Sequence, residues 1–363
     1  MALSIGIVGL PNAGKSSLFN ALSRAGAPVA AYPFTTIDPY RGVVPVPDPR
    51  VDAIASVTHP ERIVPATVEF VDIAGLVRGA SRGEGLGNQF LAQIRDADAI
   101  AHVVRCFPDP GVPHVEGAVD PVRDIEIVET ELALADLAVA ERALERARTR
   151  VKAHEPKAAE ELAVLEELSA QLQRGTPARL LPAGPRWTEM LAPLRLLTAK
   201  PVVYVANVAE HDLPQAASAA TVRRTADAQH APVVALSAKL EAEAAQLSAP
   251  EAAEVLPSYG MEASGLLRLI RIAYEMLGLV TFFTMASKEV RAWSVRRGTR
   301  APQAAGTIHT DMEHGFVRAE VIAWESLVRA GSPQAARDLG LVRLEGKDYV
   351  VQDGDVLLIR FAL

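Results

Sequence analysis

The stretch Gly9-Leu10-Pro11-Asn12-Ala13-Gly14-Lys15-Ser16 decides the fold of this chain. It follows the apolar run 5–8 and opens into residues 17–22, which have the composition of a helix. Strand, glycine loop and helix in this order form the context that a phosphate-binding P-loop requires. The N–H groups of such a loop and the N-terminus of its helix point at phosphate oxygens. The predicted nucleotide contacts in this loop are Asn12, Ala13, Gly14, Lys15, Ser16 and Ser17.

Two side chains of this loop predict magnesium-assisted chemistry at the terminal phosphate. Lys15 can reach the β- and γ-phosphates, and the hydroxyl of Ser16 can hold Mg²⁺. A threonine in an irregular loop further along can add a second magnesium ligand and sense the γ-phosphate. In the proline-containing loop 31–39, Thr36 is the predicted ligand and Thr35 is the alternative.

Residues 68–72 are predicted to form a strand that ends in Asp72, and Gly75 completes an Asp-x-x-Gly pattern. An aspartate at the end of a neighbouring strand can hold the magnesium shell, and the glycine N–H can contact the γ-phosphate. The glycine-rich loop 76–88 is then predicted to be a mobile, nucleotide-sensing segment, in which Arg78 and Arg82 can act on phosphate. The predicted metal ligands are Ser16, Thr36 and Asp72, and the predicted catalytic positions are Lys15, Gly75 and Leu76.

Leu76 occupies the place where Ras-like proteins carry a glutamine that orients the attacking water. Leucine cannot form a hydrogen bond, so another group, the phosphate itself or a partner must position the water. His102 and His114 are minor candidates, because a lone histidine is more often a surface or core residue. We predict slow intrinsic hydrolysis that a partner stimulates, and a Leu76→Gln variant with nearly unchanged nucleotide affinity. A non-catalytic binding module controlled by nucleotide stays open as an alternative.

Two later apolar runs, 200–206 and 233–236, each end in polar residues, as the base-binding edge of a parallel sheet does. The predicted base contacts are Asn207, Val208, Glu210, Ser237 and Ala238. In an ordinary GTPase the first of these segments reads Asn-Lys-x-Asp, and its aspartate accepts two hydrogen bonds from guanine. Here the lysine is absent and the acid is one methylene longer, and an unpaired guanine donor costs about 1–3 kcal/mol. Adenine offers an amino donor and ring acceptors that backbone groups near Val208 can meet. The sequence therefore predicts ATP over GTP, with a ribosome-assembly GTPase as the alternative.

The segment between these two halves has the pattern of a helical hairpin. Leu137, Ala140, Leu144, Ala147 and Val151 alternate spacings of three and four, as in a coiled-coil seam. Pro156 interrupts the pattern, and a second helix continues with Leu162, Leu165 and Leu172. Two such helices joined by a proline turn form an antiparallel hairpin, which serves either as a projecting arm or as packing support.

Composition excludes several classes of protein. The 363 residues are 49% hydrophobic and 22% charged, and a net charge of −7 gives no general nucleic-acid signature, so we expect no DNA partner. The chain has neither an apolar run of membrane-spanning length nor a signal-peptide pattern, so we expect no membrane association. The single cysteine, Cys106, fits a cytoplasmic setting and is predicted to be a buried thiol at a strand end.

Several longer motifs resemble the Obg-related YchF family of ribosome-associated ATPases. They are residues 70–77 (FVDIAGLV), 83–91 (GEGLGNQFL), 104–107 (VRCF), 131–137 (ELALADL) and 301–311 (APQAAGTIHTD). The resemblance runs essentially end to end and implies a ribosome or ribosomal RNA partner. Beside the phosphates, Asn12 can help to hold a monovalent cation such as potassium.

The resemblance also implies the domain organisation. An α/β P-loop NTPase domain, or G domain, is expected over 1–123 and 200–277, with the coiled-coil hairpin inserted over 124–199. Residues 278–363 contain strand-like runs that look like a separate small domain. The family implies that this part is a TGS domain with a ubiquitin-like β-grasp fold, which offers a second surface for the partner.

Overall fold

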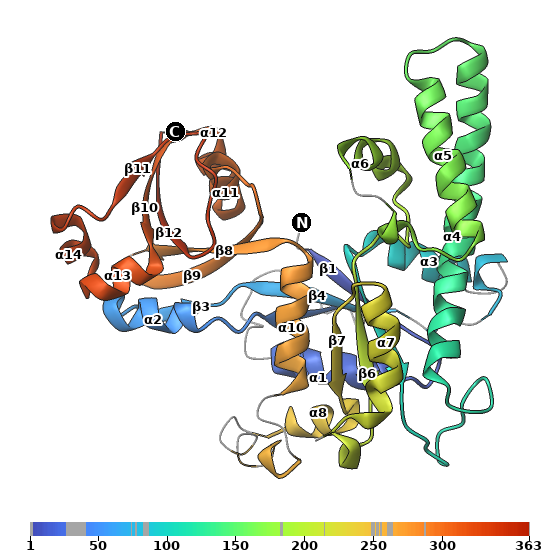
Figure 1. Cartoon of the computed structure of the whole chain (residues 1–363). Coiled ribbons are helices and arrows are strands. Elements are labelled where there is room, and N and C mark those ends of the chain that lie inside the picture. The colour runs from blue at the N-terminus through green and yellow to red at the C-terminus, as the bar shows by residue number, and fades with distance from the viewer. Residues whose placement is uncertain are drawn as a thin grey trace. The chain divides into compact units, whose positions relative to one another are not determined.

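The computed structural model describes residues 3–26, 41–73, 75–76, 78–82, 87–181, 184–213, 215–247, 251, 254, 256–259, 264–286 and 288–362. The chain divides into two compact units. The first contains Met1–Gly42 and Glu69–Leu269, and the second contains Val43–Val68 and Ile270–Leu363. Each unit is built around a sheet of its own (Figure 1).

The sheet of the first unit has the strand order β2-β4-β1-β5-β6-β7 over the described residues, and each of the four pairs from β4 to β7 is parallel. Every residue of β1, β5 and β6 is buried, which is typical of parallel strands covered on both faces. The carboxyl ends of these strands therefore lie along one edge of the sheet. Cys106, directly after β5, is buried as predicted. The strands are β1 (Ser4–Val8), β2 (Arg41–Pro45), β4 (Thr67–Asp72), β5 (Ala99–Arg105), β6 (Val202–Asn207) and β7 (Val233–Leu236).

Helices cover this sheet and enclose the main core of the first unit. The core joins strand residues such as Val8 and Ile100 to Ile94 of α3 and Val222 of α7. No helix in the described part of the chain is long and apolar enough to cross a membrane. The shorter helices are α1 (Lys15–Gly26), α3 (Gly87–Asp96), α6 (Pro185–Leu191), α7 (Ala220–Ala228), α8 (Ala238–Ala244) and α10 (Gly265–Met276), whose last turns belong to the second unit. Short 3₁₀ turns span Ala80–Arg82, Ala178–Leu180, Ala192–Leu194, Glu210–Asp212, Ala217–Ala219 and Leu256–Tyr259.

The helical hairpin is confirmed. Helices α4 (Pro121–Lys152) and α5 (Ala158–Gln173) lie side by side and extend from the sheet (Figure 1). Asp120 caps α4 by accepting hydrogen bonds from two backbone N–H groups of the first turn, and proline follows as the first helical residue, a favoured start. The predicted seam is buried between the helices at Ala140, Leu144, Ala147, Leu165 and Leu172.

The sheet of the second unit has the order β11-β10-β12-β8-β9-β3, and α11 (Ala301–Ile308) packs on one face of it. Strand β12 runs parallel to β8, whereas β8–β9, β10–β12 and β10–β11 are antiparallel. A central parallel pair with one helix across the sheet is the arrangement of the predicted β-grasp fold. The bounds are β8 (Leu279–Ala286), β9 (Glu289–Arg296), α12 (Thr310–His314), β10 (Phe316–Ala323), α13 (Trp324–Ala330), α14 (Pro333–Asp338), β11 (Arg343–Glu345) and β12 (Asp355–Phe361).

The segment 43–68 lies in a different unit from the one expected. The predicted domain 1–123 includes it, but α2 (Pro49–Thr58) and β3 (Arg62–Val64) belong to the second unit. Strand β3 pairs in parallel with β9, and Arg50 bridges Asp48 and Asp353, with an Nη1–Oδ2 distance of 2.6 Å to the latter. A three-residue strand depends on its neighbour for stability, so this placement is decided by a partner far along the chain.

Candidate functional site

The P-loop is shaped by backbone conformations that favour glycine. Gly14 has a φ of +100°, and a Cβ atom there would lie 2.2 Å from Nδ2 of Asn207. Any larger residue would therefore push the loop away from the end of β6. Asn12 also adopts a positive φ of 62°, and its Nδ2 donates a hydrogen bond of 3.0 Å to the carbonyl oxygen of Pro113. A cation beside the phosphates would use the amide oxygen of Asn12 rather than this nitrogen.

Lys15 is held close against the loop, with only 7% of its surface exposed. Its Nζ donates a hydrogen bond of 2.9 Å to the carbonyl oxygen of Leu10. Burial lowers the pKa of Lys15 to about 8, and the charge of Asp72 opposes this shift. A Cβ atom at Gly75 would lie 3.1 Å from the same Nζ, so the backbone of Gly75 runs directly past the lysine. The predicted catalytic positions Lys15 and Gly75 are thus adjacent.

Two of the three predicted metal ligands lie together. The Ser16 hydroxyl donates to a carboxylate oxygen of Asp72 at 3.2 Å. Burial raises the pKa of Asp72 and outweighs this hydrogen bond and the charge of Lys15, so the carboxylate would gain from a bound cation. A hydroxyl and a carboxylate oxygen suit magnesium, which completes its shell with water and phosphate oxygens. Thr36, its alternative Thr35 and the loop 31–39 lie outside the described residues.

At the opposite side of the loop, Asn207 connects three segments. It is 4% exposed, its Nδ2 donates to the carbonyl oxygen of Ala13 at 2.9 Å, and its Oδ1 accepts from the N–H of Ala238 at 3.0 Å. Ser237 caps the helix that begins at Ala238. The side chain of Asn207 therefore joins the P-loop to the segment after β7, and both ends of its amide are already used.

The acid of the predicted base-binding segment is also paired. Glu210 Oε1 lies 2.9 Å from Nζ of Lys239, a lysine whose side chain is 73% exposed. The Val208 N–H donates to the carbonyl oxygen of Leu236, so adenine cannot use this N–H and would need other backbone groups near Val208. A base bound at this position would contact the Glu210–Lys239 pair and the other backbone groups of the segment.

One cleft of about 860 Å³ is lined by most of the predicted contacts, namely Asn12, Gly14, Lys15, Ser16, Ser17, Asn207, Val208, Glu210, Ser237 and Ala238. The cleft also contains Arg105 and Phe107, which were not predicted as site residues. Arg105 is 3% exposed, donates to the carbonyl oxygens of Phe107 and Asp109, and stacks over the ring of Phe107 at 5.1 Å. Its Nη1 is buried without a hydrogen-bond partner in the described part of the chain. Its place at the carboxyl end of a buried strand was the available sequence signal.

Leu76 does not face the cleft. Its side chain is 1% exposed and belongs to the main apolar core, while its N–H donates to the carbonyl oxygen of Gly9. The expectation that Leu76→Gln leaves nucleotide affinity nearly unchanged stays a prediction, but the burial of Leu76 means that this substitution also affects the core. A glutamine there would bury an amide in the core, at a cost of about 1–3 kcal/mol.

The two histidine candidates occupy different settings. His102 is 2% exposed within β5, and burial lowers its pKa to about 3, so it stays neutral. His114 lies on the loop between β5 and α4, where its Nε2 is 2.7 Å from a carboxylate oxygen of Asp124. Of the two loop arginines, Arg78 pairs with Glu116 at 3.1 Å, and the side chain of Arg82 lies outside the described residues, as does 83–86.

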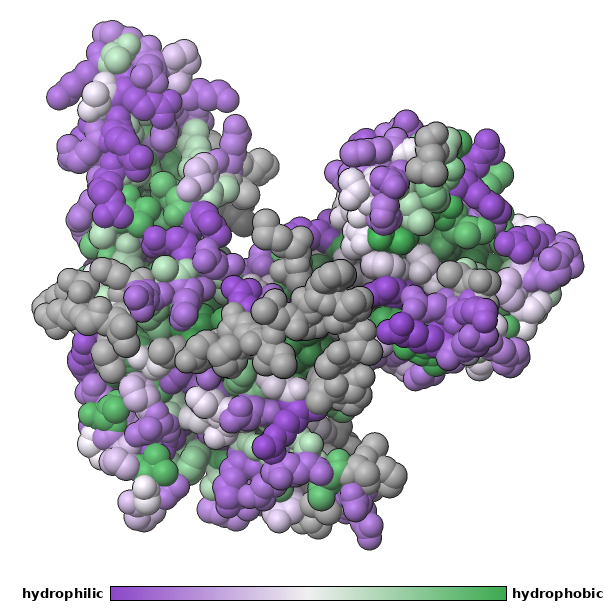
Figure 2. All heavy atoms as spheres, turned by 180° about the vertical axis from the view of Figure 1, so that it is seen from behind, coloured by the Kyte–Doolittle hydropathy of each residue, from purple (hydrophilic) through white to green (hydrophobic). Residues whose placement is uncertain are grey.

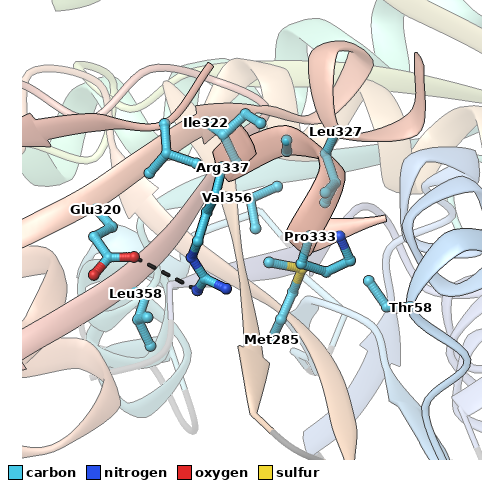
Figure 3. A pocket seen from close by; sticks show the side chains of 11 residues that line it. Thr58, Met285, Glu320, Ile322, Leu327, Pro333, Arg337, Val356 and Leu358 are labelled. Carbon is cyan, nitrogen blue, oxygen red and sulfur yellow. Dashed lines mark ion pairs between the residues drawn. The ribbon is translucent and has the colours of Figure 1, made fainter. Parts of the chain in front are cut away.

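A smaller pocket of about 220 Å³ lies in the second unit (Figure 3). Aliphatic side chains such as Ile322, Leu327 and Val356 form its walls, and the ion pair of Arg337 with Glu320, at 3.6 Å, lies at its side. It contains no glycine loop and no hydroxyl–carboxylate pair, so it does not resemble a triphosphate site. The cleft of the first unit is therefore the candidate nucleotide site.

Two protein-family models match this chain. Residues 4–142 match the model described as a 50S ribosome-binding GTPase. Residues 279–362 match the model of the C-terminal domain of YchF GTPases, described as a protein of unknown function (DUF933).

Individual relatives match over nearly the whole length. Two proteins named ribosome-binding ATPase YchF, from Haemophilus ducreyi and Haemophilus influenzae, are each 50% identical over 361 residues, covering 99% of both chains. The solved structure of the Schizosaccharomyces pombe YchF GTPase is 37% identical, with a TM-score of 0.89 over 99% of this chain and 97% of that one. Identity at this level over the full length, together with the P-loop cleft and the matching fold, shows that this chain belongs to the YchF family of P-loop proteins.

Proposed function

We propose that the chain is a magnesium-dependent ATPase that acts in the cytoplasm as a nucleotide-controlled switch. The observation that carries this proposal is that Lys15 and Ser16 line one end of the cleft, where Lys15 lies beside Gly75 and Ser16 is hydrogen-bonded to Asp72. These are the groups that P-loop enzymes use to bind the terminal phosphate and its metal ion. The YchF relatives from both Haemophilus species are named ATPases, which supports the same reaction.

Each of these residues has a separate role in phosphoryl transfer. Lys15 donates to the β- and γ-oxygens and stabilises the charge that develops there. Ser16 and Asp72 would hold Mg²⁺, which supplies charge neutralisation at the phosphates. The Gly75 N–H is proposed to contact the γ-phosphate. In this role it reports the loss of that phosphate to the segment that follows it.

The base end of the cleft supports a preference for ATP. Glu210 already accepts a hydrogen bond from Lys239, so guanine would have to replace this partner to reach the carboxylate. Adenine does not need Glu210 to leave Lys239, because its amino group and ring nitrogens do not require two acceptors on one acid. The printed names of the relatives differ here: the Haemophilus proteins are called ATPases and the S. pombe structure a GTPase. A direct comparison of both nucleotides is therefore the decisive measurement.

Slow turnover and a ribosomal partner complete the proposal. Because Leu76 is buried in the core, it places no polar group near the attacking water, and we propose that a partner orders the site. The two Haemophilus relatives are named ribosome-binding, so we propose the ribosome or ribosomal RNA, reached through the hairpin or the C-terminal domain. Hydrophilic residues cover the outer part of the hairpin, at the upper left of Figure 2, which suits a polar partner.

The test is titration of the purified protein with ATP and GTP, with and without Mg²⁺, followed by phosphate release. Tighter ATP binding with slow, magnesium-dependent release supports the proposal. Tighter GTP binding would overturn the ATP assignment, and turnover no faster than that of Lys15→Ala would identify a non-catalytic module. Repeating the assay in potassium and in sodium tests the proposed monovalent site at Asn12, since equal rates would exclude it.

A further inference from the structure

Helix α4 runs from the main core of the first unit into the hairpin. Its first half contributes Ile125, Val128 and Leu132 to the main core of the first unit, and its second half packs against α5 through Ala140 and Leu144. The helix runs for 32 residues, and no glycine or proline follows its first residue. At 1.5 Å per residue this is a continuous rod of roughly 48 Å. A displacement at its base is therefore carried along the hairpin without an intervening hinge.

Glu131, on α4, binds the segment that follows Gly75. Its carboxylate accepts hydrogen bonds from the Gly79 N–H at 2.8 Å, the Ser81 N–H at 2.9 Å and the Ser81 hydroxyl at 2.6 Å. Only 6% of Glu131 is exposed, so these are largely dry, charge-assisted hydrogen bonds, which are stronger than neutral ones. The same segment has a second attachment, because Arg78 pairs with Glu116 at 3.1 Å.

Asp136, five residues further along α4, makes a chemically matched contact with a different part of the chain. It accepts from the Leu197 N–H at 2.8 Å and from both the N–H and the hydroxyl of Thr198 at 2.7 Å. Both carboxylates thus bind two backbone N–H groups and one hydroxyl. Leu197 and Thr198, however, precede the amino end of β6, whereas the cleft lies at the carboxyl ends of the strands. Asp136 anchors the helix away from the nucleotide.

We propose that Glu131 is a positioning residue that couples the phosphate-facing segment to the helical hairpin. Gaining or losing the γ-phosphate moves Gly75, the segment 78–82 follows, and Glu131 passes that movement to α4. Coupling between two binding sites is reciprocal, so a partner bound to the hairpin changes nucleotide affinity through the same contacts, and we expect it to change turnover as well. The part of this inference that concerns turnover rests on the proposed ATPase function.

The substitution Glu131→Gln tests the connection with little change in shape. Three donors face the carboxylate, and a glutamine offers them one acceptor oxygen and an NH₂ group that is itself a donor. At least one of the three hydrogen bonds is therefore lost. Asp136→Asn removes the same kind of contact at the other anchor and serves as the matched control.

The experiment compares hydrogen exchange of 78–82 and of α4 and α5, with and without a non-hydrolysable ATP analogue. We expect the analogue to change exchange in α4 and α5 of the wild type and of Asp136→Asn, but not of Glu131→Gln. In a parallel assay, phosphate release by Glu131→Gln should change about tenfold, while its ATP dissociation constant stays within about threefold. Asp136→Asn should lower the melting temperature without changing either value by more than about threefold.

Equal behaviour of the two variants would overturn the proposal, because both carboxylates would then be purely structural. Ser81→Ala removes only the hydroxyl contact and replaces Glu131→Gln if that variant does not fold. It should show a partial loss of the exchange response, and an unchanged response would again overturn the proposal. If the wild type releases no phosphate, the ATPase proposal fails, yet the exchange comparison still decides whether Glu131 couples bound nucleotide to the hairpin.

Discussion

Two lysines of one cleft, Lys15 and Lys239, are stabilised in opposite ways. Lys15 lies at the phosphate end, formed by residues 12–17, where it is 7% exposed and burial lowers its pKa to about 8. Lys239 lies at the base end, formed by 207–210 and 237–239, where its side chain is 73% exposed. The hydrogen bond and charge of Glu210 raise the pKa of Lys239.

This difference separates the residues that act on the phosphates from those that select the base. A lysine that is already buried and fixed in place loses little solvation and little conformational freedom when it binds a phosphate. The phosphate end is therefore preorganised for the reaction. An exposed ion pair is weak, because water and salt screen it. The Glu210–Lys239 pair can therefore be changed in evolution or in the laboratory without disturbing the P-loop.

Lys15→Ala should lower phosphate release by about 10²–10³-fold, because it deletes a preorganised cation at the reacting phosphate. Single-turnover phosphate release measures this loss. Lys239→Ala is the control and should release phosphate from ATP at nearly the wild-type rate. Similar losses in the two variants would show that the two ends of the cleft are not independent.

Asn207→Ala should lower the free energy of unfolding by about 2–4 kcal/mol, since it leaves the carbonyl oxygen of Ala13 and the N–H of Ala238 unpaired in a buried place. Urea denaturation measures the change, and the nucleotide affinity should fall with it. Asn20→Ala, on an exposed position of α1 that also lines the cleft, is the control. A loss of affinity with unchanged stability would mean that Asn207 serves the base directly.

Nucleotide affinity should fall about tenfold between pH 7 and pH 9. In the free protein the pKa of Lys15 is lowered to about 8, and the phosphates raise it again on binding because they favour the charged form. Binding then takes up a proton above pH 8, so affinity decreases as the pH rises. Titration calorimetry in buffers of different ionisation enthalpy detects the proton, and the Lys15→Ala variant should lack it.

Glu210→Asp should improve GTP relative to ATP by about threefold to tenfold, the smallest of these effects, because an exposed pair contributes little. The shorter acid moves away from Lys239 and approaches the geometry that guanine requires. Competition binding with both nucleotides measures the ratio. An unchanged ratio would assign selectivity to backbone groups of the cleft, and phosphate release from ATP should stay near the wild-type rate.

The core of the site was predictable because local patterns specify it. The P-loop, the acid at the end of β4 and the hairpin seam each depend on residues within a few positions of one another, and the structure places Lys15, Ser16, Asp72 and Gly75 together. The burial of Leu76 was not predictable in this way. Its position after Gly75 indicated a place near water, but its direction depends on core residues from several other elements.

By itself the sequence determined the order of elements, the phosphate-binding loop, the inserted hairpin and the presence of a small C-terminal domain. Only the tertiary structure placed 43–68 with the second unit, paired Glu210 with Lys239, and joined Glu131 to the segment 78–82. The physical reason is how far apart in the sequence the interacting residues lie. The spacing of apolar residues, the conformation of glycine and the capping of helices each depend on residues that lie within a few positions of one another in the sequence. A hydrogen bond or strand pair between distant segments depends on where the packed core holds them.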